Sequence, residues 1–155
     1  AQKAYEKGVK VVLNPAPACS LPESLFQHLY MITPNRIEAE MLTGVKINSK
    51  KDVAVAADVL YRKGVKNIII TLGGEGSFVR EGEKTCYIDA CKVVPVDTTA
   101  AGDTFNGAVC VGVSEGMSLE QAVLFASKAS SISVTRMGAQ SSIPYRKELD
   151  INNLV

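Results

Sequence analysis

The run from Asn67 to Leu72 constrains the fold more than any other part of the sequence. It places Ile68, Ile69 and Ile70 in succession, without the alternation of polar and apolar residues that a half-exposed strand shows. A short β-branched run of this kind is typical of a strand that is buried on both faces. Such strands belong to parallel sheets covered by helices on both sides, so the chain is predicted to be an α/β protein.

Strand-like and helical patterns alternate along the rest of the chain, which supports this fold class. The predicted strands are residues 9–13, 31–33, 67–72 and 92–96, with a hairpin at 77–80 and 84–88. The predicted helices are residues 1–7, 20–30, 35–43, 50–63, 103–114 and 119–134. We therefore expect a three-layer, mostly parallel sheet with helices on both faces and an antiparallel edge formed by the hairpin.

Capping signals define several of the predicted helix ends. Ser20 with Glu23, and Asn35 with Glu38, have the spacing of a capping box, in which each residue bonds the backbone of the other. Gly44 follows the helix that Asn35 starts and is suited to ending it. The Asn35–Glu38 pair therefore already has a purely structural explanation.

Composition limits the classes of function. The chain has 155 residues, which fit one domain, and 46% hydrophobic and 21% charged residues, as in globular proteins. A net charge of +1 without a cluster of lysine and arginine argues against nucleic acid or an anionic membrane surface as partner. With four cysteines lacking C-x-x-C spacing and one histidine, a zinc site or a catalytic triad is disfavoured. We expect a cytoplasmic protein that acts on small molecules.

The segment from Asp97 to Ala108 is predicted to hold an anion. Ala100, Ala101 and Gly102 let the backbone approach a ligand closely, and Asp103 follows at a predicted helix start. The first N–H groups of a helix lack partners within it and carry the positive end of its dipole, so they are suited to a phosphate. Asp103 has two interpretations, an N-cap of the helix or a general base beside the phosphate.

Asn14, Asn35 and Gly73 each come just after a predicted strand. Ligands of parallel α/β sheets bind beyond the carboxyl ends of the strands, so we expect these residues to line one crevice with residues 97–103. The turn at residues 73–76, Gly-Gly-Glu-Gly, is neither a Walker A loop nor a G-x-G-x-x-G fingerprint. A dinucleotide-dependent enzyme is therefore disfavoured.

Several motifs resemble those of the ribokinase-like (PfkB) carbohydrate kinases in order and rough spacing. They are Asp-Thr-Thr-Ala-Ala-Gly-Asp-Thr-Phe at 97–105, Asn-Pro-Ala-Pro-Ala at 14–18, Thr-Pro-Asn-Arg-Ile-Glu-Ala-Glu at 33–40, Ile-Thr-Leu-Gly at 70–73 and Thr-Arg-Met-Gly-Ala-Gln at 135–140. The resemblance covers nearly the whole chain and roughly the C-terminal half of a family member. It implies a ribokinase-like fold in which residues 1–155 form one ATP-binding and catalytic portion, with the N-terminal part and its lid outside this sequence.

The resemblance also implies roles for individual residues. Asp103 would accept the proton of the 5-hydroxyl of D-ribose, and the amides of Ala100, Ala101 and Gly102 would surround the transferred phosphate. Mg²⁺ is implied near Asn35 and Glu38, by way of water. The residues implied to contact ATP are Asn35, Glu38, Thr71, Leu72, Gly73, Gly74, Glu75, Gly76, Gly102 and Ser127. The residues implied to hold K⁺, several through backbone carbonyls, are Asp97, Thr99, Ser133, Arg136, Gly138 and Ser142.

The activity implied by the resemblance is transfer of the γ-phosphate of ATP to D-ribose, giving D-ribose 5-phosphate. Other family members that phosphorylate deoxyribose, fructose or a nucleoside are the nearest alternative. An inactive nucleotide-binding fragment is the alternative from a different class. The resemblance further implies a homodimer formed through the N-terminal lid, and negligible kinase activity for the isolated fragment.

Overall fold

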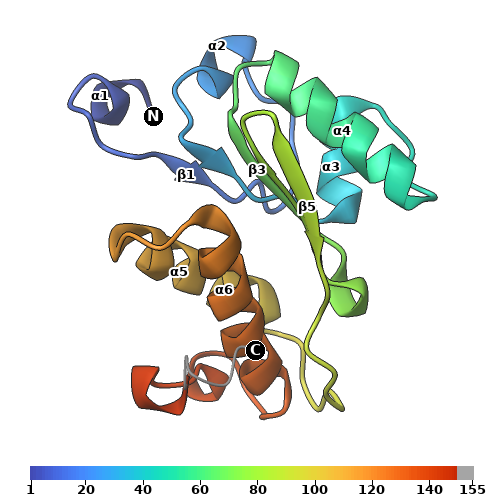
Figure 1. Ribbon diagram of the computed structural model, residues 1–155, viewed down its shortest axis with the longest axis vertical. Helices are drawn as coiled ribbons and strands as arrows, with labels where there is room; N and C mark the ends of the chain where they lie inside the picture. Colours follow the sequence, from blue (N-terminus) through green and yellow to red (C-terminus); the bar gives the residue numbers. More distant parts are fainter. Residues whose placement is uncertain (150–155) are drawn as a thin grey trace. The chain divides into compact units, whose positions relative to one another are not determined.

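The computed structural model describes residues 1–149, which form two compact units (Figure 1). The first unit comprises Ala1–Gly73 and Ser77–Tyr87, and the second comprises Gly74–Gly76 and the chain from Ile88 onward. The prediction that the chain makes a single domain stays a prediction.

The first unit is built on a five-stranded mixed sheet. Its strands are β1 (Val12–Leu13), β2 (Met31–Ile32), β3 (Asn67–Thr71), β4 (Ser77–Glu81) and β5 (Lys84–Ile88), in the order β1-β2-β3-β4-β5. β1 pairs with β2 and β2 with β3 in parallel, whereas β3 pairs with β4 antiparallel. The predicted α/β fold with an antiparallel edge is therefore confirmed.

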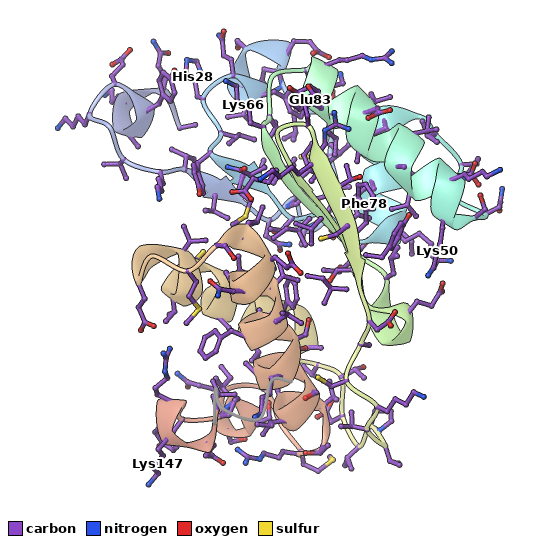
Figure 2. All side chains as sticks on the ribbon, viewed as in Figure 1. His28, Lys50, Lys66, Phe78, Glu83 and Lys147 are labelled. Atoms are coloured by element: carbon purple, nitrogen blue, oxygen red, sulfur yellow. The ribbon has the colours of Figure 1, made fainter. Side chains whose placement is uncertain are left out.

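The centre of this sheet is β3, as the isoleucine run predicts. Ile68, Ile69 and Ile70 are all 0% exposed. Phe78 on the neighbouring β4, labelled in Figure 2, is also buried, and its ring lies 4.9 Å from that of Tyr87 on β5. Consecutive buried residues along one strand require cover on both of its faces, because successive side chains point to opposite sides.

Four helices accompany the sheet: α1 (Gln2–Tyr5), α2 (Glu23–Phe26), α3 (Arg36–Thr43) and α4 (Lys50–Arg62). α3 and α4 pack against each other and against β3 (Figure 1). The buried residues of α4 are Val53, Ala56, Ala57 and Leu60, spaced as one face of a helix. The apolar face of α4 thus forms one wall of the core behind β3.

Local signals explain the ends of α3 and α4. Asn35 and Ser49 cap the two helices with their side-chain oxygens, and α3 ends at Gly44, whose φ of 74° lies in the left-handed region. The predicted starts of both helices are confirmed. As a result, α3 begins directly after Asn35, one of the predicted ligand contacts.

The capping box predicted at Ser20 and Glu23 is wrong. α2 is only four residues long, its N-cap is Pro22, and no side chain caps it. It also ends at Phe26 and not near Tyr30, because Tyr30 leaves the helix and donates its N–H to the carbonyl of Val11 at 2.8 Å. The strand predicted at residues 9–13 is correspondingly shorter, since only Val12–Leu13 pair with β2.

The second unit is dominated by α5 (Ala101–Ser114) and α6 (Leu119–Val134), which pack side by side. They approach closely at Gly112, where a Cβ atom would lie 2.9 Å from that of Ala122. Two short 3₁₀ helices follow, η2 (Gln140–Ser142) and η3 (Arg146–Glu148). A further 3₁₀ helix, η1 (Gly73–Glu75), stands at the boundary between the two units.

The strand predicted at residues 92–96 is also wrong. These residues form no strand, and Val94 is 83% exposed. The N–H of Val96 donates instead to the carbonyl of Val134 at 2.7 Å, at the end of α6. Valine-rich sequence favours a strand, but here the backbone is bonded to a helix terminus and has no strand partner.

Candidate active site

The first turn of α5 carries the amides predicted to surround a phosphate, and the structure shows that the N–H of Ala101, one of the three predicted, is already bonded. Ala100 is the N-cap residue, and no side chain caps the helix. Within residues 1–149, the N–H groups of Gly102 and Asp103 donate to no backbone carbonyl, whereas that of Ala101 donates to Thr98 at 3.1 Å. Two N–H groups at the positive end of a 14-residue helix are therefore open to an anion.

Asp103 lies in this turn as the third residue of α5. The interpretation of its carboxylate as the N-cap is therefore wrong, because Ala100 occupies that position. The Asp103 side chain is exposed, and it has no hydrogen-bond or ion-pair partner in the part of the chain that the structure describes. The Asp103 carboxylate and the open N–H groups therefore lie in the same helical turn.

Asp97 fixes the loop that leads into the helix. One carboxylate oxygen accepts hydrogen bonds from the hydroxyl and the N–H of Thr99, and the other accepts from the N–H of Gly138 at 2.9 Å. These bonds, led by that from the Thr99 hydroxyl, hold the pKa of Asp97 below its ordinary value. The carboxylate thus stays ionised and joins two of the segments predicted to hold K⁺.

The remaining residues predicted to hold K⁺ lie at and beyond the end of α6. Ser133 and Ser142 are both 1% exposed, and their hydroxyl oxygens are 2.9 Å apart. The guanidinium of Arg136 forms an ion pair with the carboxylate of Glu148, and this bond raises the pKa of Arg136. The charge of Arg136 is therefore paired with Glu148 and not with Asp97. A carboxylate together with carbonyl oxygens fits a hard cation, so the residues present are compatible with K⁺. The K⁺ site itself stays a prediction.

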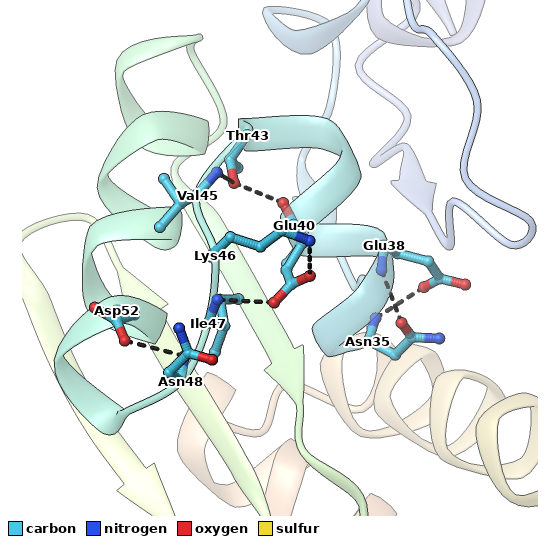
Figure 3. A network of polar contacts seen from close by, with 10 residues as sticks. Asn35, Glu38, Glu40, Thr43, Val45, Lys46, Ile47, Asn48 and Asp52 are labelled. Atoms are coloured by element: carbon cyan, nitrogen blue, oxygen red, sulfur yellow. Dashed lines mark hydrogen bonds and ion pairs between the residues drawn. The ribbon is translucent and has the colours of Figure 1, made fainter.

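Asn35 and Glu38 form the predicted capping box at the start of α3 (Figure 3). Oδ1 of Asn35 accepts from the N–H of Glu38 at 2.9 Å, and Oε2 of Glu38 accepts from the N–H of Asn35 at 2.8 Å. The NH₂ group of Asn35 and the second carboxylate oxygen of Glu38 take no part in the box. Those atoms remain for a hydrated Mg²⁺ ion or a phosphate, so the structural and the ligand-binding role are compatible.

β3 places Thr71 beside Asn35. The two residues form a parallel bridge, and the N–H of Thr71 donates to the carbonyl of Pro34 at 3.0 Å. Leu72 and Gly73 follow directly at this end of the strand. Two segments predicted to contact ATP, residues 33–40 and 70–73, are therefore held together by backbone bonds.

Gly76 ends the glycine-rich turn in a conformation that requires glycine. Its φ is +92°, and an added Cβ would lie 2.0 Å from the carbonyl oxygen of Ile88. At Gly74, by contrast, a Cβ would meet nothing within 4 Å. The close backbone approach at Gly76 is the physical reason for a glycine there.

The structure brings the predicted residues together in three groups. These are the first turn of α5 with Asp103, the loops joined by Asp97, and the end of β3 with Asn35 and Glu38. Ser127 lies half-buried on α6, away from the ends of that helix. Its contact with ATP, and the convergence of these groups with Asn14 in one crevice, stay predictions.

Ser130, which sequence reasoning missed, contacts the first turn of α5, and so does Ser133, which was predicted only as a contact to K⁺. The hydroxyl of Ser130 on α6 donates to the carbonyl of Ala101 at 3.0 Å, and that of Thr104 donates to Ser133 at 3.3 Å. Ser130 and Ser133 are three residues apart, so they share one face of a helix. The three-residue spacing of these two serines is the sequence feature that indicates a shared contact of this helix face.

Among residues 1–149, no group of three or more His, Cys, Asp or Glu side chains is placed to hold a metal ion. A metal in this range would therefore rely on backbone oxygens, amides, hydroxyls or water for much of its coordination. The helices of the same range are all too short or too polar to cross a membrane.

Comparisons with known proteins agree on one family. The sequence model described as pfkB family carbohydrate kinase matches residues 1–146. The ribokinase of Haemophilus influenzae is 48% identical over 148 residues, which are 96% of this chain and 48% of that protein. The deoxyribokinase of Salmonella typhi is 36% identical over 138 residues, which are 88% of this chain and 45% of that protein.

A solved structure gives the same result for the fold. The structure of Arabidopsis thaliana ribokinase complexed with ribose and ATP matches with a TM-score of 0.91 and 32% identity. It covers 99% of this chain, and this chain covers 49% of it. The chain thus spans about half the length of the relatives it matches.

The ribokinase-like fold implied by the motifs is confirmed by these matches. The family model extends across all the groups of residues described above, from Asn35 to Ser142. On this ground, the chain belongs to the pfkB family of carbohydrate kinases.

Proposed function

We propose that the protein containing this chain transfers the γ-phosphate of ATP to the 5-hydroxyl of D-ribose, giving ADP and D-ribose 5-phosphate. The proposal is supported by the 48% identity to the Haemophilus influenzae ribokinase and by the fold shared with a ribokinase that binds ribose and ATP. The chain spans about half of such proteins, so the activity is proposed for the whole protein. ATP and D-ribose are its proposed substrates.

The observation that carries this proposal is the exposed carboxylate of Asp103 next to two open N–H groups. Phosphoryl transfer relies on positioning and on stabilising charge, with one group to accept the proton of the attacking hydroxyl. Asp103 would take that proton while the hydroxyl oxygen forms its bond to phosphorus and the bond to ADP breaks. The N–H groups of Gly102 and Asp103 would stabilise the charge on the transferred phosphate.

The nucleotide would be held at the end of β3 and the start of α3. The NH₂ group of Asn35 suits a phosphate oxygen, and the second oxygen of Glu38 suits a water molecule of hydrated Mg²⁺. Mg²⁺, when bound, would neutralise charge on the phosphates of ATP. Thr71 and the turn at residues 73–76 would contact the rest of the nucleotide.

The Asp97 loops would hold K⁺ as an activating ion. Asp97 already joins residues 97–99 to residue 138, so a cation at this place would further order the loop that leads into α5. We also propose that the protein is cytoplasmic and forms a homodimer through its N-terminal part. Neither proposal depends on the site residues named above.

The decisive experiment compares sugar acceptors for the full-length protein. ADP release with Mg-ATP would be measured against ribose, deoxyribose, fructose and adenosine, with and without K⁺. We expect the highest kcat/KM with ribose, and activation by K⁺. A preference for deoxyribose would instead favour the second candidate, to which the 36% identity with the Salmonella typhi deoxyribokinase points. No turnover with any of the four acceptors would refute the proposed kinase activity.

The chain of residues 1–155 alone is expected to behave differently. Its relatives are about twice as long, so we expect weak ATP binding and negligible turnover from the chain alone. Titration with ATP followed by calorimetry, together with the same ADP assay, measures both. Robust turnover by the chain alone would contradict this expectation.

A further inference from the structure

A buried chain of hydroxyl groups connects the first turn of α5 to the loop after α6. The hydroxyl of Thr104 donates to that of Ser133 at 3.3 Å, Ser133 lies 2.9 Å from Ser142, and Ser142 donates to the carbonyl of Ala139 at 2.7 Å. Thr104, Ser133 and Ser142 are 5%, 1% and 1% exposed. Water is therefore excluded from these hydroxyl groups by the surrounding protein.

The chain has one consistent direction, because each hydroxyl has a single proton to donate. Ser142 gives its proton to Ala139, so it must accept from Ser133. Ser133 then has only its lone pairs for Thr104, which must be the donor. Loss of the Ser133 hydroxyl would leave a buried donor on one side and a buried acceptor on the other.

The consequence falls on the turn that carries Asp103. Thr104 is the next residue of α5, and its N–H closes the first helical bond, to Ala100. A threonine hydroxyl without another partner commonly donates to the carbonyl four residues back in its own helix, here that of Ala100. This would give the Ala100 carbonyl a second donor and rotate the residue beside the open N–H groups.

A second bond acts on the same turn. The hydroxyl of Ser130, one helical turn before Ser133, donates to the carbonyl of Ala101 at 3.0 Å. The first turn of α5 is thereby held at two points by one face of α6. Ser131 supplies an internal contrast, since its hydroxyl donates at 2.7 Å to Lys128 within α6 itself.

We propose that Ser133 is a positioning residue, whose hydroxyl links Thr104 to Ser142 and so holds the first turn of α5 in the orientation needed for phosphoryl transfer by Asp103. The proposal deepens the proposed kinase function and rests on it. Phosphoryl transfer depends on alignment, and a displacement near 1 Å lowers rates by on the order of 100-fold. Binding of ATP and sugar relies mostly on other residues and should change little.

The test compares Ser133→Ala with Ser131→Ala in the full-length protein. Both variants remove one hydroxyl from α6, but only the first breaks the link to α5. We expect Ser133→Ala to lower kcat by on the order of 10- to 100-fold, with the KM values for ATP and sugar within about twofold of wild type. Ser131→Ala should stay within about twofold in all three constants. Equal kcat values for the two variants would overturn the proposal.

Amide hydrogen exchange tests the hydroxyl link without any substrate, so its result does not depend on which sugar the enzyme phosphorylates. We expect the amides of Thr104 and Phe105, which close the first helical bonds of α5, to exchange about tenfold faster in Ser133→Ala and unchanged in Ser131→Ala. Unchanged exchange in Ser133→Ala would also overturn the proposal, even if kcat fell. If wild type lacks kinase activity, the proposed function fails while the exchange comparison still tests the link. If Ser133→Ala does not fold, Ser142→Ala breaks the next bond of the chain and is measured in its place.

Discussion

Asn35 offers the sharpest separation of structure from function, because different atoms of one side chain serve the two roles. Its Oδ1 accepts the bond from the N–H of Glu38 that caps α3, whereas its NH₂ group is the proposed contact to ATP. Alanine at this position removes both groups. Serine keeps an oxygen acceptor suited to an N-cap and removes only the NH₂ group.

The expected changes in stability follow from the capping box. In Asn35→Ala the bond to the N–H of Glu38 is lost, while the bond from the backbone N–H of residue 35 to Glu38 can remain. Loss of an N-cap costs about 1 kcal/mol in the free energy of unfolding. For a chain of this size, that corresponds to a decrease of roughly 2–4 °C in the melting temperature. Asn35→Ser should stay within about 0.5 kcal/mol of wild type.

The expected changes in activity follow a different order. A hydrogen bond to a charged group contributes about 1.5–3 kcal/mol, so loss of the NH₂ group should lower kcat/KM for ATP by roughly 10- to 150-fold. Both variants should show this loss, although only Asn35→Ala is destabilised. Urea unfolding followed by circular dichroism and an ADP-release assay of the full-length protein measure the two effects. Full activity in Asn35→Ser would refute the ligand role and leave Asn35 as a helix cap alone.

Three further predictions concern the second unit. Asp103→Asn should lower kcat by about 10²- to 10⁴-fold, and unchanged turnover would remove Asp103 as the base. Its free energy of unfolding should fall by no more than about 1 kcal/mol, because the exposed side chain loses only its charge near the helix dipole. The bond from Arg136 holds the pKa of Glu148 below its ordinary value near 4.5, so this pair stabilises the fold above that pH and loses its effect as pH falls through the lowered pKa. Thermal melts between pH 3 and pH 7 should therefore show a steeper acid loss in wild type than in Glu148→Gln, and parallel curves would contradict the assignment. Gly76→Ala should lower the free energy of unfolding by about 3 kcal/mol or more, because its Cβ would lie 2.0 Å from a carbonyl oxygen. Gly74→Ala should unfold at nearly the wild-type urea concentration, because its Cβ would meet nothing within 4 Å. Similar urea midpoints for the two variants would contradict the packing described.

The predictable parts of the fold are those where local signals act alone. The isoleucine run at residues 68–70 has no polar residue to place on a surface, so its burial could be inferred directly. Asn35, Ser49 and Gly44 act within a few residues of themselves, so the ends of α3 and α4 also followed from the sequence. The parallel pairing of β1, β2 and β3 followed from the helices between them.

The failures arose where a distant partner decides the local structure. Ser20 has the spacing of a capping box, yet Pro22 starts a short helix and Tyr30 bonds to Val11. Residues 92–96 have the composition of a strand, but the N–H of Val96 bonds to Val134 at the end of α6. No local pattern in a single sequence indicates such bonds between distant residues.

The candidate site shows the same division. The first turn of α5, which is predicted to hold an anion, and the Asn35–Glu38 pair were recognisable because their residues are contiguous or three apart. The link from Thr104 through Ser133 was missed, because serine and threonine occur in many environments and only packing brings these two hydroxyls together.

The hydrogen bond between Asp97 and the N–H of Gly138 also has a consequence for the order of folding. It closes a loop across a separation of 41 residues, and both α5 and α6 lie inside that loop. Closing a long loop costs entropy that is recovered only when the intervening segments have packed. We therefore expect the turn at residues 97–99 to acquire its final conformation after the two helices have docked, as one of the last steps of folding.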